Sequence, residues 1–277
     1  MSKLIIIIIV LFVHGISSYA QYSNKNYTEM RDEGVSFMKR GNFPVAYKKL
    51  KGAEGFAEKS WEKAEISNLR KQLQDSINNT YKRGIGLAEN AKSLKSYSSA
   101  VEELKKLVPT ENLKVSHVYS WLGYCYENLN EPFGAIDYYN EGVKHNEAFS
   151  AIKLVSLLPK YKSVSKDSIR HLYNIAYNCY KQSGANYDKY QMATLLITNK
   201  VSSTDDPIQI LQQLSEKNYA DAQYYLGMLY FYGEKVNKDE AKGLRLINSA
   251  KENGSDKAKQ WLIERNQELN KRNYIYR

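Results

Sequence analysis

A repeat of 36 residues near the C-terminus constrains the fold of this chain more than any other feature. A shift of 36 positions places small residues on small ones, large apolar residues on large apolar ones, and one turn-forming residue on another. The matched pairs are Leu211 with Ile247, Leu214 with Ala250, Asn218 with Gly254, Ala222 with Ala258, Tyr225 with Trp261, and Leu226 with Leu262. A unit of this size cannot bury its own apolar face. The chain is therefore expected to fold as an array of stacked repeats.

Residues 220–254 predict two short helices joined by a turn. Gly227 lies on the apolar face of the first helix, where a neighbouring helix can approach closely, and Gly233 is expected to end that helix. Asn237 and Glu240 predict a capping box for the second helix. Asn253-Gly254 predicts a left-handed end for the second helix. The expected apolar faces are Ala222, Leu226, Leu229 and Tyr230 in the first helix, and Ala241, Leu244, Ile247 and Ala250 in the second.

Earlier parts of the chain show related patterns. A first pair begins at a capping box of Asn26 and Glu29, with Gly34 as its close contact to Ala46 and a turn at Gly41. A degenerate copy begins near Tyr81 and comprises Ala88, Ala91, Tyr97, Ala100, Leu104 and Leu107. A clearer copy begins near Ser116 and comprises Tyr119, Leu122, Gly123, Tyr126, Ala135, Tyr139 and Gly142. Residues 57–79 predict one further amphipathic helix or lengthened repeat helices, and residues 149–200 predict a diverged pair, its first helix from 169 to 180 and its second from 190 to 197.

Three of these copies resemble known helix-pair repeats. The first pair, with Gly34 and Ala46 expected in close contact, is similar to a tetratricopeptide repeat. The residues Leu226-Gly227, Tyr230, Gly233, Val236, Asp239, Ala250 and Gly254 look like a Sel1-like repeat, a variant of the tetratricopeptide helix pair. Tyr119, Leu122, Gly123 and Tyr126 are similar to the tetratricopeptide pattern, with Tyr in place of Trp. The resemblance implies an all-α, right-handed superhelical solenoid of stacked antiparallel helix pairs. The copy after Leu262 departs from the pattern, so residues 256–270 are interpreted as a terminal capping helix.

The N-terminus has the features of a bacterial signal peptide. Lys3 precedes an apolar run over residues 4–13, and the small residues Ser18 and Ala20 predict cleavage before Gln21. The apolar run is much shorter than the ~20 residues of a spanning helix, so cleavage is favoured over a membrane anchor. The predicted organisation is a signal peptide at 1–20, a tetratricopeptide-like array at 21–205, Sel1-like repeats with the capping helix at 206–270, and a tail at 271–277. The chain is therefore expected to be exported, to the periplasm or outside the cell.

The charge of the chain is compatible with two kinds of surface. Removal of residues 1–20 takes away Lys3 and leaves 39 basic and 30 acidic side chains, a net charge of +9. Export makes nucleic acid an improbable partner, and the basic surplus favours a solvated face or contact with an anionic envelope surface. Lysines cluster at residues 48–51, 105–106 and 160–166. Cys125 and Cys179 lie inside helical patterns among core-type neighbours and are expected to be free thiols.

No pattern for catalysis is present in the sequence. It contains no HExxH pair, CxxC, GxSxG elbow or phosphate-cradling GxxxxGK. Gly84-Ile85-Gly86 lacks the preceding strand of a dinucleotide fingerprint, and the histidines at 117, 145 and 171 are not spaced as metal ligands. The chain is interpreted as a non-enzymatic protein without a cofactor or metal.

Partner binding is the better-supported function. The tetratricopeptide resemblance implies that the first helix of each pair lines a concave groove. The predicted partner-binding residues are His117, Ser120, Tyr124, Glu127 and Asn128 in one repeat, and Asp221, Tyr224, Met228, Phe231 and Tyr232 in another. For the second set, packing against the preceding diverged pair is an equal alternative. The leading hypothesis is an exported adaptor that binds another protein; a module for an anionic envelope polymer or lipid surface, and an enzyme with an unrecognised site, remain open.

Overall fold

The computed structural model describes residues 2–108 and 117–275, with side chains described for 21–108, 117–269 and 271. All regular secondary structure within these residues is α-helical, in thirteen helices. The chain divides into two compact units, Met1–Gly142 and Val143–Arg277, which are described separately below. None of the helices, over the residues that the structure describes, combines the length and the apolarity needed to cross a membrane.

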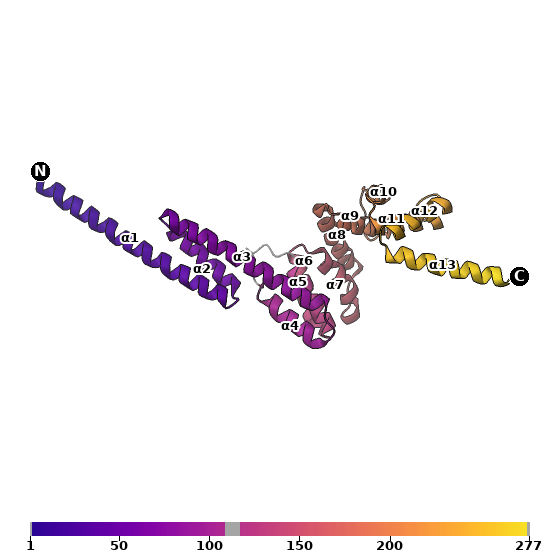
Figure 1. Ribbon diagram of the computed structural model, residues 1–277, viewed down its shortest axis with the longest axis horizontal. Helices are drawn as coiled ribbons and strands as arrows, with labels where there is room; N and C mark the ends of the chain where they lie inside the picture. Colours follow the sequence, from indigo (N-terminus) through magenta and orange to yellow (C-terminus); the bar gives the residue numbers. More distant parts are fainter. Residues whose placement is uncertain (1, 109–116, 276–277) are drawn as a thin grey trace. The chain divides into compact units, whose positions relative to one another are not determined.

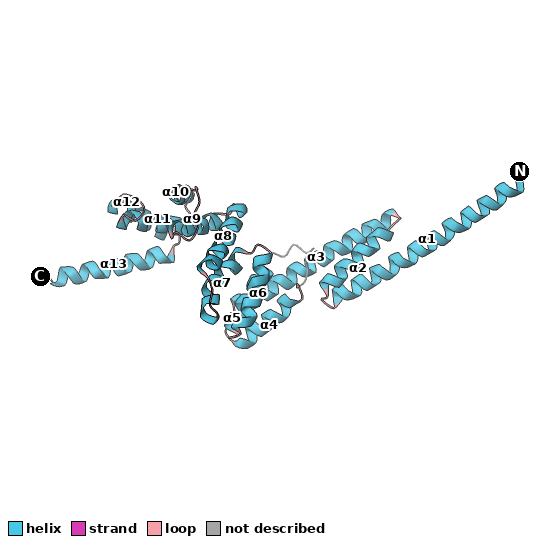
Figure 2. Cartoon of the chain, turned by 180° about the vertical axis from the view of Figure 1, so that it is seen from behind, coloured by secondary structure: helices cyan, strands magenta, loops and turns pink. Residues whose placement is uncertain are grey.

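The first unit is built from consecutive helices that pack on their neighbours in sequence. Within each pair, such as α1 with α2 and α3 with α4, the two helices run in opposite directions (Figures 1 and 2). The helices are α1 (Ser2–Lys39), α2 (Phe43–Phe56), α3 (Ser60–Glu89), α4 (Leu94–Lys105), α5 (Val118–Asn128) and α6 (Pro132–Lys144, ending just inside the second unit). The connections from α1 through α4 and from α5 to α6 are short, as expected for antiparallel helix pairs.

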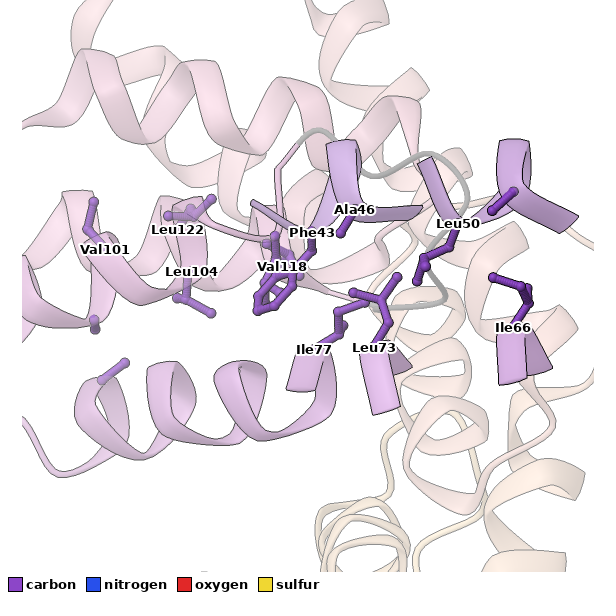
Figure 3. Close-up of a cluster of buried hydrophobic side chains, with 14 of the residues drawn as sticks. Phe43, Ala46, Leu50, Ile66, Leu73, Ile77, Val101, Leu104, Val118 and Leu122 are labelled. Carbon is purple, nitrogen blue, oxygen red and sulfur yellow. The ribbon is translucent and has the colours of Figure 1, made fainter. Parts of the chain in front are cut away.

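One continuous apolar core runs through these helices (Figure 3). Leu50 of α2 and Leu73 and Ile77 of α3 are almost completely buried in it. The same core continues to Leu104 of α4 and Leu122 of α5. Removal of this apolar surface from water is the main stabilising contribution of the unit.

Within the predicted segment 57–79, residues 60–79 belong to a lengthened repeat helix, the second of the two alternatives. α3 continues without a break from Ser60 to Glu89, so the extra segment and the first helix of the degenerate copy are one helix. Its first half packs on α2 and its second half on α4, where Gly84 lies against Leu104. The long helix therefore serves two consecutive pairs. Trp61 is the exception on its predicted apolar face, because 54 % of its surface is exposed.

The predicted capping box at Asn26 is wrong. α1 continues from Ser2 to Lys39, and the Asn26 side chain donates to the carbonyl of Tyr22 one turn earlier. Among the described side chains of α1, Ser23 and Tyr27 are buried. Tyr27 donates a 2.6 Å hydrogen bond to Glu65 and thereby ties α1 to α3. The side chains of residues 1–20, on which the cleavage prediction depends, lie outside the described side chains.

The second unit continues the same plan. Its helices are α7 (Ala148–Tyr161), α8 (Lys166–Ser183), α9 (Asn186–Ile197), α10 (Pro207–Glu216), α11 (Ala220–Tyr232), α12 (Glu240–Glu252) and α13 (Asp256–Ile275). Both helices predicted for the diverged pair are found, as α8 and α9, but the 36-residue repeat makes α10 equivalent to α12, so α9 pairs with α10 and α8 with α7. The interval 149–200 also contains α7, which the sequence analysis missed. The capping helix is present as α13, which buries Ala258 and continues to Ile275.

The 36-residue repeat is reproduced in backbone geometry. Asn218 and Gly254 are equivalent in the repeat, and both have left-handed φ angles, 57° and 95°. The following residue closes the same hydrogen bond in each copy, from Tyr219 to the carbonyl of Leu214 at 3.0 Å and from Ser255 to Ala250 at 2.8 Å. These are the 6→1 bonds of the Schellman motif, which ends helices at a glycine or asparagine. The repeat seen in the sequence is therefore a structural repeat.

The predicted N-cap of α12 is wrong by two residues. The cap is Asp239, whose carboxylate accepts from the backbone N–H of Lys242 at 2.8 Å, and not Asn237. The buried face of α12 is also shifted. Ala241 is exposed and Leu244 half-buried, whereas Gly243, Ile247 and Ala250 form the buried face.

Glycines set the closest helix contacts. A Cβ on Gly227 would lie 2.8 Å from Ile247 and 2.9 Å from the carbonyl oxygen of Gly243, which confirms the predicted close approach. Gly243, the matching glycine on α12, was not predicted. Gly34 makes a similar contact, but with Leu50 rather than with Ala46. α11 and α12 approach closely because both have a glycine, Gly227 and Gly243, where they cross.

Candidate functional site

The predicted binding residues on α5 are largely used inside the protein. Ser120 is buried, with 4 % of its surface exposed, so it is not available to a partner. The Tyr124 ring packs edge-on against Trp121 of the same helix and against Tyr97 of α4, with ring centroids 5.7 and 6.1 Å apart. His117 is exposed and caps α5 in a left-handed backbone conformation.

Glu127 of α5 forms a hydrogen bond with Tyr139, a buried tyrosine of α6. It accepts a 2.5 Å hydrogen bond from the hydroxyl of Tyr139, which has no exposed surface. The Tyr139 ring covers Gly123, where a Cβ would clash with it. Asn128 donates to the carbonyl of Tyr124 in its own helix. Burial and the Glu127 carboxylate raise the pKa of Tyr139. This face of α5 therefore stabilises the helix pair, and Glu127 cannot be altered without an effect on Tyr139.

The aromatic set on α11 is also covered, but by a different element from the one expected. Tyr224 and Met228 pack on a core of Ile247, Ala250 and Ala258, together with Trp261 of α13. Phe231 lies edge-on to Trp261 at 5.1 Å, and the Arg265 guanidinium lies 4.9 Å from the Phe231 ring. The packing alternative is thus correct in kind, but its partner is the following helix α13 rather than the preceding pair. Of this set, Tyr232 is the most open, with 53 % of its surface exposed.

A second group of residues on α9 and α11 forms a more accessible surface, which we call the tyrosine–carboxylate surface. It consists of Tyr187, Asp188, Tyr190, Tyr219 and Asp221. The Tyr190 ring lies 5.9 Å from the ring of Tyr219, so α9 and the start of α11 are in direct contact. Tyr187 exposes 54 % of its surface. Only Asp221 of this group was predicted.

The two carboxylates act on the tyrosines around them. Burial is the main cause that raises the pKa of Tyr190 to about 12, and the negative charge of Asp221 is the next. Burial, and after it the charges of Asp188 and Asp221, raise the pKa of Tyr187. Burial, and after it the charge of Asp221, raise the pKa of Tyr219. All three phenols are therefore neutral hydrogen-bond donors at physiological pH, and they surround a negative charge. Asp188 is anchored by Ser183, whereas Asp221 makes no hydrogen bond or ion pair with any other described residue.

The position of this surface in the repeat explains why it was missed. α9 precedes α10 as α11 precedes α12, so α9 and α11 are the first helices of successive pairs. Their outward residues are those that a partner meets in a helix-pair array. Residues 186–190 carried the signal, since two tyrosines flank an aspartate and a lysine there. Only the contact between α9 and α11 shows that they join Asp221.

The candidate metal ligands and cysteines singled out in the sequence were also located in the structure. Within them, no three histidine, cysteine, aspartate or glutamate side chains come together as metal ligands. Gly84 lies inside α3 and not in a phosphate-binding loop. Both cysteines are free, and burial raises the pKa of the Cys125 thiol to about 12. Lys181 and Tyr177 bind Asp205, an arrangement that fixes the segment after α9 to α8.

Comparison with known proteins gives likeness of fold at low sequence identity. No protein-family model matches the sequence, and no curated protein matches it. A Sel1 repeat protein from Oxalobacter formigenes is similar over 82 % of this chain and 86 % of its own, at 18 % identity and a TM-score of 0.47. A protective antigen of uropathogenic Escherichia coli with an SLR fold is similar over 87 % of this chain, at 14 % identity and a TM-score of 0.43. The present chain spans 65 % of that antigen's length.

The chain has a helix-pair repeat fold. The evidence is the packing itself: successive helix pairs, glycines at the crossings, and helix ends closed by asparagine or glycine. The resemblance to Sel1-like and tetratricopeptide repeats is confirmed at this level. The handedness of the superhelix over the whole chain stays a prediction.

Proposed function

We propose that this protein is a non-enzymatic scaffold that binds a segment of another protein along the first helices of its second unit. The observation that carries the proposal is the tyrosine–carboxylate surface, and Asp221 in particular. Asp221 is half-buried in the first turn of α11, where the helix dipole stabilises it, and its carboxylate makes no hydrogen bond or ion pair with another described residue. Its acceptor oxygens are therefore open to a cationic group of a partner next to the exposed ring of Tyr187. Helix-pair arrays bind extended peptides and helices at this position.

The chemistry of the surface specifies the kind of segment. Asp188 and Asp221 provide negative charge, and the exposed ring of Tyr187 provides a face that attracts a cation. Neutral tyrosine hydroxyls add hydrogen-bond donors and acceptors that fix orientation. A segment with lysine or arginine residues separated by apolar ones fits this combination. Aromatic anchors contribute much of the free energy of such interfaces.

The aromatic residues of α11 that pack near α13, and Tyr232 beside them, are not part of the proposed surface. The face of α5 is not part of it either, because Ser120 is buried and Glu127 binds Tyr139. The proposal thus places binding at residues of α9 and the start of α11. It keeps the predicted export of the mature protein from Gln21 onward, so the partner is expected among envelope or secreted proteins.

The test uses a displayed peptide library and one charge reversal. Peptides selected on the mature protein are expected to be enriched in lysine and arginine. The Asp221→Arg variant is expected to bind them about thirtyfold more weakly, the effect of about 2 kcal/mol that is usual for a central interface residue. Titration calorimetry measures this loss.

The matched control is Glu216→Arg, which makes the same change of charge at an exposed position on α10, a second helix of a pair. Its affinity is expected to equal that of the wild type. Selected peptides without basic residues, or an equal loss in both variants, would show that binding does not occur at the tyrosine–carboxylate surface.

A further inference from the structure

A cavity of about 340 Å³ opens in the first unit, where three separate parts of the chain meet. One wall is the turn from α1 to α2 at Gly41, and another is the middle of α3. The third is Lys106 at the end of α4, whose side chain lies 3.6 Å from the position of a Cβ on Gly41. The lining side chains are Met38, Lys39, Arg40, Phe43, Ser76, Asn79, Thr80, Arg83 and Lys106.

The charge of the cavity is strongly one-sided. Four of its lining residues are cationic and none is acidic. The nearest compensation is Glu103 of α4, which binds Arg83 at 2.8 Å and Lys106 at 2.6 Å. One carboxylate thus serves two cations. Three positive charges remain uncompensated around the cavity.

Lys39 and Arg40 are the cationic residues of the cavity that are not neutralised by a carboxylate of the described residues. Neither forms an ion pair with any other described residue. Arg40 donates to the carbonyl and hydroxyl oxygens of Ser36 and stacks on the Phe37 ring at 4.4 Å. These contacts hold its guanidinium in place without neutralising it. The end of α1 and the start of α2 meet at this turn, so their opposed dipoles largely cancel and the side chains decide the local potential.

We propose that this cavity binds a phosphate group. A phosphate brings up to two negative charges and several acceptor oxygens to a site with a net charge of +3, in which Arg40 has no ion pair with another described residue and is suited to bidentate contacts. The amide of Asn79 adds a neutral donor at the rim. The volume lies at the lower end of the ~300–1,000 Å³ usual for small-molecule sites, enough for the phosphate and the first atoms of the molecule that carries it. This site is independent of the tyrosine–carboxylate surface, which lies in the other unit.

Two sources of phosphate share this chemistry, a soluble ion or ester and the headgroup of an anionic phospholipid. The experiment measures both on the mature protein at constant ionic strength, because screening by salt would imitate a loss of binding. Inorganic phosphate is titrated in one arm. Vesicles of phosphatidylglycerol, with phosphatidylcholine vesicles as reference, are used in the other.

The test variant carries Lys39→Gln and Arg40→Gln. Its control carries Lys48→Gln and Lys51→Gln, which remove the same charge from exposed positions on α2 outside the cavity. The test variant is expected to lose about tenfold or more in phosphate affinity, the effect of charge-assisted hydrogen bonds, while the control keeps it. All four positions are exposed, and matching far-ultraviolet circular dichroism confirms that both variants are folded.

If the wild type and the control variant bind inorganic phosphate and the test variant does not, the source is a soluble phosphate. If the wild type and the control variant bind phosphatidylglycerol vesicles and the test variant does not, the source is a phospholipid headgroup. Equal losses in test and control variants would assign the binding to overall charge and overturn the proposal. So would the absence of binding in both arms.

Discussion

The contact between Gly243 and α11 provides the sharpest test of how the repeat is held together. A Cβ at Gly243 would lie 2.7 Å from the carbonyl oxygen of Gly227 and from the backbone nitrogen of Phe231. It would also lie 2.9 Å from the Phe231 Cα. All three atoms belong to the backbone, so no side-chain rotation relieves the clash. In Gly243→Ala, α12 must move away from α11 by about 0.5 Å or more, which loosens the packing of Ile247.

The expected magnitude combines two opposed effects. Overpacking costs about 1–3 kcal/mol, and the backbone nature of this clash favours the upper end of that range. Alanine in place of glycine inside a helix returns about 1 kcal/mol. The free energy of unfolding of Gly243→Ala is therefore expected to fall by about 2 kcal/mol. This corresponds to a decrease of about 6 °C in melting temperature for a unit of this size.

Gly86→Ala is the matched control. Gly86 also lies inside a helix, α3, but an added Cβ there meets nothing within 4 Å. Only the propensity effect applies, so this variant is expected to gain up to about 1 kcal/mol. Urea unfolding followed by circular dichroism gives both values, and hydrogen exchange of α11 and α12 amides locates the effect. A Gly243→Ala variant as stable as the wild type would refute the packing argument, as would a loss of stability in Gly86→Ala.

Four further outcomes are expected. Gln223→Leu should lose about 1 kcal/mol or more in urea unfolding, because the buried amide donates to the Ser215 carbonyl of α10 and accepts from Asn253 at the end of α12, and both hydrogen bonds are lost; a neutral effect would contradict this. Asn218→Gly should keep wild-type stability, whereas Asn218→Ala should lose about 1 kcal/mol at a φ of 57°; equal melting temperatures for the two would count against it. Because burial raises the pKa of Cys125 to about 12, this thiol stays protonated well above pH 8 and should resist alkylation there until unfolding, after the half-buried Cys179 has reacted; equally fast labelling of both argues otherwise. Finally, N-terminal sequencing of exported protein should return Gln21, and recovery of the uncleaved chain would disprove the signal-peptide prediction.

Packing between helices decided most of what the sequence analysis missed. The α12 cap lies at Asp239 rather than Asn237, because both residues are able to cap and the position of α12 on α11 selects between them. The Asn26 cap does not form because α1 is already helical before it. Local sequence cannot distinguish a helix start from a polar residue inside a longer helix when apolar spacing continues on both sides.

The same reason accounts for the candidate sites. The groove residues of α5 lie on a polar face in the sequence, yet Glu127 is placed against the hydroxyl of Tyr139 and Ser120 against its neighbours. The cavity near Gly41 combines residues that are far apart in the chain, such as Arg40 and Lys106. No spacing rule brings these together, because their proximity depends on how consecutive helix pairs stack.

The sequence by itself determined the helical class, the 36-residue repeat, the glycine at the crossing of α11 and the left-handed helix ends. These features follow from local requirements, since helical periodicity, close approach and positive φ each select residue types directly. The tertiary structure alone decided that α3 is one long helix, that α13 covers the aromatic face of α11, and that Asp221 meets the tyrosines of α9. Each of these depends on which apolar faces find one another in three dimensions, and many pairings satisfy the same linear pattern until the core is packed.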